Sequence, residues 1–215
     1  MDAAIAELVT RAASAPADGE GGEDRTSERI LDAALQEAAA VGLQRLTVED
    51  VVRRAGVGRM TAYRRFPRRD DLVQALVLRE TRRFLGAVAA GIDRAAEPRE
   101  GVAEAFVAAV AFARTHPLLR RAAQTEPGGL IDTVAADDAA LLEMGAAFIA
   151  RHIHGDAAGA PSREARWVAD AFARLFLTYV AIPPRDPSPR DDAELRRFAH
   201  ELLTPMVERV ALPPS

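Results

Sequence analysis

The residues with the clearest chemical potential lie in one short segment, TVEDVVRRAGVGRMTAYRRFP, residues 47–67. Between Arg45 and Arg69 the chain holds eight arginines against Glu49 and Asp50, a local net charge of +6 in a protein whose total is −4. Guanidinium groups bind phosphate oxygens and can pair with two acceptors at a guanine edge. Because this positive charge is concentrated in one short stretch, the segment predicts contact with a polyanion.

The elements that must position these arginines are three short helices. Each is predicted from apolar residues at helical spacing, from a capping residue at its start and from a glycine or proline at its end. They cover residues 26–42, 47–56 and 58–66. Three helices with a glycine turn between the second and the third are typical of a helix-turn-helix, in which the third helix enters the major groove of DNA.

The third helix has one face suited to reading bases. If Ala62 and Phe66 point into a small core, the remaining side chains point outward or flank that face. An arginine can bind guanine O6 and N7 together, and methyl groups can contact thymine, each good contact contributing about 1–3 kcal/mol. The DNA-binding residues predicted here are Arg59, Met60, Thr61, Tyr63, Arg64 and Arg65.

Residues 26–76 resemble the DNA-binding domain of the tetracycline-repressor (TetR) family. The resemblance lies in LTVEDVVRRAGV, in MTAYRRFP and in RRDDL. It implies phosphate contacts for Thr47, Tyr63 and Arg69, and base reading by Arg59, Met60, Thr61 and Arg64. Gly58 stands where the family usually has serine, and Met60 where a small residue is common. The resemblance also implies a ligand-binding and dimerisation domain in the rest of the chain.

The chain as a whole is predicted to be all-α. A disordered acidic arm is expected over residues 1–25, which carry six acidic residues against two arginines, followed by a helix-turn-helix domain over 26–72 and a larger helical effector-binding and dimerisation domain over 73–212. A helix over 69–95 should bridge the two domains. Further helices are expected over 100–115, 130–154 and 162–182, with a last amphipathic helix after the proline-rich loop 183–189.

Two sets of apolar residues in the larger domain are candidates for function. A pocket for a small, largely apolar effector is predicted among Phe84, Val88, Phe106, Val110, His116, Leu118, Leu130 and Phe148. A dimer interface is predicted among Trp167, Phe172, Phe176, Tyr179, Leu195, Phe198 and Leu202. Ordinary core packing is the competing interpretation of both sets, because core, pocket and interface residues share the same helical spacing.

Several other chemistries are not expected. The chain has no cysteine, so it has no disulfide, thiolate nucleophile or Cys-ligated zinc. His152 and His154 diverge by about 200° on a helix, so a metal site with Asp156 is not expected. No cofactor is expected either, and the sequence has no phosphate-binding loop, nucleophile elbow or paired catalytic carboxylates. No apolar run reaches the roughly 18–20 residues that span a bilayer, so we expect a cytoplasmic protein with no membrane contact.

These observations predict a transcriptional regulator rather than an enzyme. We expect a homodimer that binds double-stranded DNA at a pseudo-palindromic operator and is released by a small, largely apolar effector, with repression as the default. One alternative is a helical adaptor that binds a protein partner and carries a vestigial DNA-binding module. Another is a small helical enzyme, for which the sequence nominates no catalytic residue.

Overall fold

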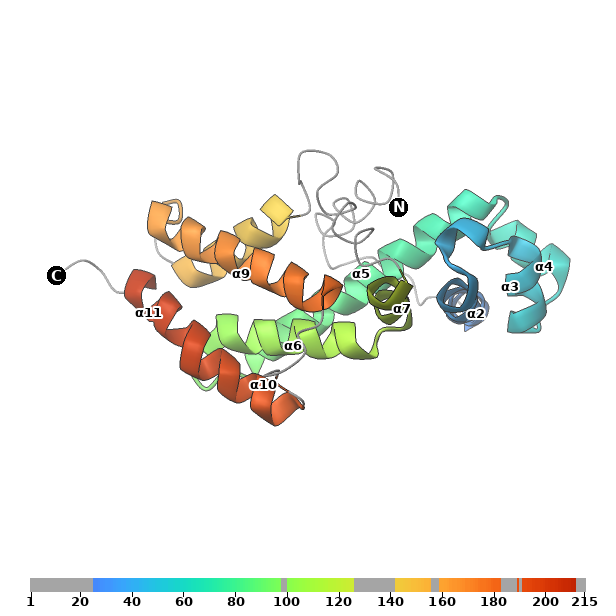
Figure 1. The fold of residues 1–215 in the computed structure, drawn as a ribbon. Helices are drawn as coiled ribbons and strands as arrows, with labels where there is room; N and C mark the ends of the chain where they lie inside the picture. The colour runs from blue at the N-terminus through green and yellow to red at the C-terminus, as the bar shows by residue number, and fades with distance from the viewer. Residues whose placement is uncertain are drawn as a thin grey trace.

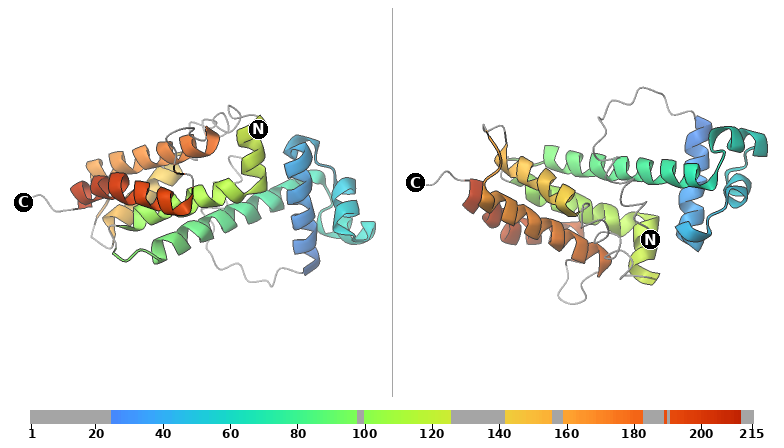
Figure 2. Two further views of the ribbon diagram at one scale, coloured as in Figure 1. Left: turned by 60° about the horizontal axis from the view of Figure 1, so that its bottom comes forward. Right: turned by 90° about the horizontal axis from the view of Figure 1, so that it is seen from above.

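The computed structural model describes residues 25–97, 100–125, 142–155, 159–182, 189 and 191–211. Helices and short turns make up these ranges, and no β-strand occurs in them. The helices form two units connected by the long helix α5, Arg69–Asp93, which runs from one unit into the other (Figures 1 and 2). The predicted all-α class is therefore confirmed.

The N-terminal unit packs three helices and the start of α5 around one small core. Its elements are α2 (Arg25–Val41), a 3₁₀ turn (Leu43–Arg45), α3 (Val48–Ala55) and α4 (Arg59–Arg65). Each of the four helices buries at least one apolar side chain in this core, which includes Ile30, Leu46, Val51, Ala62, Leu72 and Leu76. Helices α3 and α4, with 8 and 7 residues, are too short to be stable alone, so burial of this shared core holds the unit together.

Local sequence sets the two ends of α3. Thr47 caps its start, with the side-chain oxygen accepting a hydrogen bond from the Asp50 backbone N–H at 3.2 Å. Gly56 ends it in the left-handed conformation, with a φ of 63° that a residue with a Cβ adopts at a cost. The tight turn between α3 and α4 therefore depends on Gly56.

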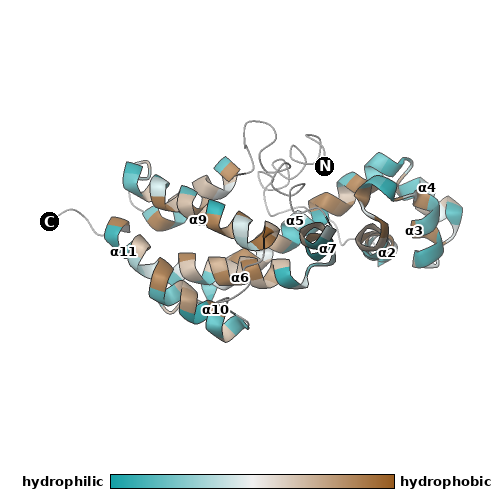
Figure 3. Cartoon of the chain, in the orientation of Figure 1, coloured by the Kyte–Doolittle hydropathy of each residue, from teal (hydrophilic) through white to brown (hydrophobic). Residues whose placement is uncertain are grey.

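The C-terminal unit is built around α6, Gly101–Thr115. This helix contacts α5, α7, α9, α10 and α11, and it is buried on most of its circumference. Hydrophobic residues accordingly run along α6, whereas hydrophilic residues cover the outer side of α4 (Figure 3). The elements around α6 are α7 (Pro117–Thr125), a helix over 142–154, α9 (Arg163–Ala181), α10 (Asp192–Phe198), a π-helical turn (Ala199–Leu203) and α11 (Thr204–Ala211).

Close approach of α5 and α6 depends on one glycine. A Cβ added to Gly91 would lie 2.6 Å from the Cβ of Ala108 and 2.8 Å from the carbonyl oxygen of Glu104. Alanines on α6, including Ala105 and Ala109, are buried along this side. Small side chains on both helices therefore allow the two axes to pack close together.

Most predicted helices are present, with some differences at their ends. The first helix already begins at Arg25, and residues 1–24 of the predicted acidic arm lie outside the described residues. The helix predicted over 130–154 is described from 142 onward, so Leu130 also lies outside them. The last predicted helix contains a π-helical turn between α10 and α11.

Apolar helix length bears on the question of membrane contact. Among the described helices, no single one combines the length and hydropathy needed to cross a membrane. The pair α6 and α7 passes the test of length and composition only when the two are joined, and they bend by 76° at His116.

Candidate nucleic-acid interface and effector site

The outer face of α4 is exposed as the sequence predicts. Ala62 is 1% exposed and Phe66 is 9% exposed, which fixes the inward side of the helix. Arg59 and Arg64 are exposed, and the Met60 side chain is 85% exposed. The Met60 side chain is therefore accessible to another molecule.

Thr47 takes part in a small polar cluster at the start of α3. Besides capping the helix, its hydroxyl donates a hydrogen bond to the Asp50 carboxylate at 2.6 Å, and Asp50 also pairs with Arg53. The hydrogen bond from Thr47, followed by the one from Arg53, holds the pKa of Asp50 below its usual range. Thr47 is exposed and Asp50 is partly exposed, so this cluster lies at the surface.

Tyr63 joins α4 to the same end of α3. Its hydroxyl donates a hydrogen bond to the Glu49 carboxylate at 2.5 Å. This bond lowers the pKa of Glu49, with help from the helix backbone and the charge of Arg59, and it raises the pKa of Tyr63. Glu49 therefore places a negative charge within the surface of α3 and α4 that is expected to bind DNA phosphates.

Arg69 lies beside the same cluster, at the first position of α5. Its guanidinium donates hydrogen bonds to the carbonyl oxygens of Leu46 at 2.9 Å and Leu43 at 2.6 Å, and it pairs with Asp70 at 3.0 Å. These bonds fasten the 3₁₀ turn to the start of α5. Arg65 faces a different neighbour, with its Nε donating to the Ser27 hydroxyl at 3.0 Å.

The structure thus brings the predicted phosphate-binding residues Thr47, Tyr63 and Arg69 together around the N-terminal end of α3. Sequence reasoning did not identify the hydrogen-bonding partners of these residues. Thr47 and Asp50 are three residues apart, a spacing that is readable as a cap. Glu49 and Tyr63 are 14 residues apart on different helices, so only the packing of α4 against α3 reveals their contact.

The described residues of the predicted effector pocket are divided between the packed cores and the surface. Val88, Phe106 and Val110 are buried in the apolar cores around α6, and the ring of Phe84 lies 5.6 Å from those of both Phe112 and Phe176. Leu118 packs against the N-terminal core, whereas Phe148 is 45% exposed. For Val88, Phe106 and Val110 the core interpretation is therefore the one that the packing supports.

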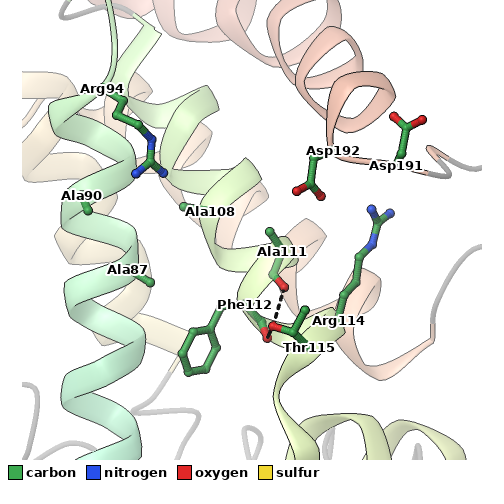
Figure 4. Close-up of a pocket in the computed structure, with 10 residues that line it drawn as sticks. All are labelled: Ala87, Ala90, Arg94, Ala108, Ala111, Phe112, Arg114, Thr115, Asp191 and Asp192. Atoms are coloured by element: carbon green, nitrogen blue, oxygen red, sulfur yellow. Dashed lines mark hydrogen bonds between the residues drawn. The ribbon is translucent and has the colours of Figure 1, made fainter.

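A surface hollow of about 520 Å³ lies elsewhere, between α5, α6 and the start of α10. Alanines of α5 and α6 and the Phe112 ring form its floor, while Arg94, Arg114, Asp191 and Asp192 are placed around it (Figure 4). No residue of the predicted effector pocket lines this hollow. It is wide open to solvent and carries charges of both signs.

His116 belongs to a buried polar network rather than to a pocket wall. Its Nε2 lies 3.2 Å from the Glu80 carboxylate, and the other Glu80 oxygen accepts a hydrogen bond from Arg79 at 2.7 Å. Arg79, 5% exposed, also pairs with Asp32 at 3.0 Å and with Glu28 at 3.2 Å on α2. Burial alone would raise the pKa of Glu80, but the His116 and Arg79 contacts outweigh it and the pKa is lowered.

Helix α7 makes a second connection to the N-terminal unit. The Arg121 guanidinium donates to the carbonyl oxygens of Ala40 at 2.7 Å and Ala39 at 3.3 Å, which lie in the last turn of α2. A cation at the C-terminal end of a helix is electrostatically favourable. Together with the Arg79 network, Arg121 means that both ends of α2 are held by the C-terminal part of the chain.

The predicted dimer residues divide into surface and core. Trp167 is 62% exposed, with the Arg163 guanidinium 4.9 Å from its ring centre, and Leu202 is 57% exposed. Phe172 and Leu195 are buried in the protomer's own core, at 2% and 0% exposed. Both pack in the core cluster that includes α6, as the competing core interpretation expects. Three aromatic residues, Phe176, Tyr179 and Phe198, are partly buried beside the same cores.

No metal site emerges from the described residues, where no group of three or more potential ligands converges. His152 and His154 lie on the helix over 142–154, and each has a buried Nε2 without a hydrogen-bond partner. Burial lowers the pKa of His152 and so favours its neutral form. Asp156 lies outside the described residues.

Family models match both units of the chain. Residues 30–76 match the family described as "Bacterial regulatory proteins, tetR family", and residues 97–205 match "Bacterial Tetracyclin repressor, C-terminal domain". The chain belongs to the TetR family. Its N-terminal match covers the helix-turn-helix geometry described above, and its C-terminal match covers the bundle around α6. The TetR assignment makes the protein a DNA-binding transcriptional regulator, and it does not favour the adaptor alternative.

Relatives of this TetR regulator include two proteins of Mycobacterium tuberculosis. The HTH-type transcriptional regulator Rv1255c, itself uncharacterised, is 27% identical over 186 residues, covering 84% of this chain and 85% of that protein. The HTH-type transcriptional regulator AlkX is 26% identical over 184 residues, with 85% of each chain covered. The crystal structure of the TetR family repressor AlkX from Dietzia sp. strain DQ12-45-1b shares the fold, with a TM-score of 0.55 and 24% identity over 85% of this chain and 97% of that one.

Proposed function

We propose that this TetR regulator is a repressor that binds a pseudo-palindromic operator as a homodimer and is released by a small, largely apolar effector. The observation that carries the proposal is the outer face of α4, where Arg59, Met60 and Arg64 are exposed while Ala62 fixes the opposite side in the core. A short helix held by its neighbours and presenting such side chains fits the major groove. DNA binding and dimerisation are properties of the family.

Each predicted DNA-binding residue receives one of two roles in this proposal. Base reading falls to the α4 face, with Arg59 and Arg64 as hydrogen-bond donors and Met60 and the Thr61 methyl as apolar contacts. Phosphate binding falls to Thr47, Tyr63, Arg65 and Arg69, and it supplies affinity without sequence information.

An apolar effector is supported by the relatives and by the chemistry of the C-terminal unit. The Dietzia repressor is implicated in the biodegradation of n-alkanes. In this chain, aromatic rings of α5, α6 and α9 meet at Phe84, Phe112 and Phe176, with ring centres of Phe84 and its two neighbours 5.6 Å apart. Rings that can separate around an apolar molecule offer it a dry environment without any charged partner.

The proposed release depends on the two connections from the C-terminal unit to α2. The His116–Glu80–Arg79 network holds the first turns of α2, and Arg121 holds its last turn. An effector that shifts the bend between α6 and α7 would therefore move α2, and with it the small core that supports α4. Because two recognition helices must lie about one DNA turn apart, a change in their separation weakens operator binding. The coupling is reciprocal, so operator DNA weakens effector binding by the same factor.

Selection of fragmented genomic DNA by the purified protein, followed by sequencing, tests the proposal. We expect a few fragments that share an inverted repeat. The Arg59→Ala variant should lose roughly 5- to 150-fold in affinity for them, the range that one good base contact represents. The matched control is Arg151→Ala, which removes an exposed arginine from the helix over 142–154 and should bind as the parent does.

Two results would count against a sequence-specific repressor. One is enrichment that follows only the amount of DNA loaded, and the other is equal binding by the Arg59→Ala variant. Once the repeat is known, n-alkanes and their oxidised derivatives of increasing chain length are the first compounds to test for release of the protein from DNA.

A further inference from the structure

Three of the proposed phosphate-binding residues, Thr47, Tyr63 and Arg69, already hold an internal acceptor. The Thr47 hydroxyl donates to Asp50, the Tyr63 hydroxyl donates to Glu49, and the Arg69 guanidinium donates to main-chain carbonyls and to Asp70. Arg69 has five N–H donors and can add a phosphate to its partners, whereas a hydroxyl has a single proton. Thr47 and Tyr63 therefore cannot bind a phosphate as donors until they release a carboxylate.

The Glu49 partner of Tyr63 can be separated from the stability of the helix. Asp50 occupies the third position of α3 and belongs to the helix cap through Thr47, so changing it would also damage the start of the helix. Glu49 is exposed, lies in the first turn and makes its side-chain hydrogen bond across to α4. Removing its charge leaves the Thr47 cap intact.

Glu49 is also an ionised group within a surface that must approach phosphates. The tyrosine hydroxyl, the helix start and Arg59 all favour its charged form. When the Tyr63 proton turns toward a phosphate oxygen, Glu49 loses its partner and remains as a negative charge beside another negative charge. The exchange replaces one charge-assisted hydrogen bond by another and adds a repulsion.

From this geometry we infer that Glu49 is an internal competitor of DNA phosphate for the Tyr63 hydroxyl and that it weakens binding to DNA of any sequence. It is a positioning residue that sets the strength of the phosphate contact, while α4 supplies the sequence preference. The inference rests on the proposed role of Tyr63 in phosphate binding. A moderate affinity of this kind suits a repressor that an effector must release.

The test compares the full-length protein with its Glu49→Gln variant on a DNA duplex of random sequence and on an operator fragment, by fluorescence anisotropy. We expect affinity to rise about fivefold on both duplexes, the effect of one unit charge about 4 Å from a phosphate in water. The log–log slope of affinity against salt should also steepen, because one more phosphate contact is effectively neutralised. Glu201→Gln, at an exposed position of the π-helical turn, controls for the change in net charge and should bind as the parent does.

A double-mutant cycle with Tyr63→Phe distinguishes competition from a structural effect. In the parent, removing the hydroxyl costs a hydrogen bond in the free protein as well as in the complex, so affinity should fall less than threefold. In the Glu49→Gln background the free-state bond is weaker, so the same change should cost clearly more. A Tyr63→Phe loss of equal size in both backgrounds would overturn the inference, and so would unchanged or weaker binding by Glu49→Gln.

These outcomes are distinguishable from a failure of the proposed function. If the parent binds an operator in an Arg59-dependent manner while Glu49→Gln has no effect, the inference fails alone. If Arg59→Ala binds every duplex as the parent does, the assigned interface is wrong and both fail. The affinity of Tyr63→Phe in the parent background, which should fall less than threefold, is a second measurement that does not depend on how well the Glu49→Gln variant folds.

Discussion

Two glycines of α5 provide a direct test of how α5 and α6 pack. Gly86 is exposed, and a Cβ added there would meet nothing within 4 Å. Gly91 is buried, and the same atom would lie 2.6 Å from the Ala108 Cβ and 2.8 Å from the carbonyl oxygen of Glu104. Gly86 lies in the interior of α5 and Gly91 in its last turn. Both have helical backbone, and they differ in what surrounds them.

Substitution by alanine should change stability in opposite directions at these sites. Alanine is favoured over glycine inside a helix by about 0.5–1 kcal/mol, and Gly86→Ala should gain that amount. At Gly91 the contacts are with a helix backbone and a Cβ, neither of which can rotate away. Overpacking of this kind costs about 1–3 kcal/mol, which outweighs the helix gain. We expect a net loss of about 1–2 kcal/mol for Gly91→Ala.

Thermal and urea unfolding followed by circular dichroism would measure both effects. In a domain of this size 1 kcal/mol corresponds to about 2–4 °C, so a stability difference of about 1.5–3 kcal/mol should separate the two melting temperatures by roughly 3–12 °C. Protomer concentration must be equal in all samples, because a dimer's melting temperature depends on it. The packing argument would be refuted by a Gly91→Ala protein that is as stable as Gly86→Ala.

Three further predictions follow from the structure. Thr47→Ala should lower the free energy of unfolding by about 1 kcal/mol in urea titrations, whereas Thr47→Ser should keep most of the cap's stabilisation. Equal losses in the two variants would mean that the hydroxyl cap is not what stabilises the helix. Trp167→Ala should leave the protomer folded but shift the monomer–dimer equilibrium toward monomer in sedimentation experiments. Phe172→Ala should instead lower the free energy of unfolding by about 3–5 kcal/mol. A Trp167→Ala protein that dimerises as the parent does would remove this side chain from the proposed interface. Because the folded-state pKa of Glu80 is below its ordinary 4.5, its stabilising effect is present above that value and is lost as pH falls through the folded-state pKa. Acid titrations should therefore show a smaller loss of stability in Glu80→Gln than in the parent, and parallel curves would contradict the role of His116 and Arg79 in holding the charge.

The helix-turn-helix was readable from the sequence because its signals are local. Thr47 and Gly56 set the ends of α3 through contacts and backbone angles within a few residues, and the inward side of α4 follows from Ala62 and Phe66. Such features depend on the order of residue types along a single helix. The all-α class and the position of the recognition helix therefore needed no tertiary information.

The larger unit was less predictable because apolar spacing does not say what covers a helix. Phe172 and Trp167 are both large aromatic residues of α9, yet one is buried against α6 and the other is exposed. Likewise Val110 belongs to a packed core, although it has the residue type expected of a pocket. Burial depends on which neighbour lies opposite, and that neighbour is distant in sequence.

Sequence alone determined where the chain is helical, which helix presents arginine to a polyanion and where glycine must end a helix, since each of these follows from contacts within one or two turns. Only the tertiary structure decided that Tyr63 donates to Glu49, that Arg79 joins α2 to His116, and that Phe172 is core. The residues in these contacts are distant in sequence, and they meet because burial of the shared cores fixes the angles between helices, which a single sequence does not encode locally.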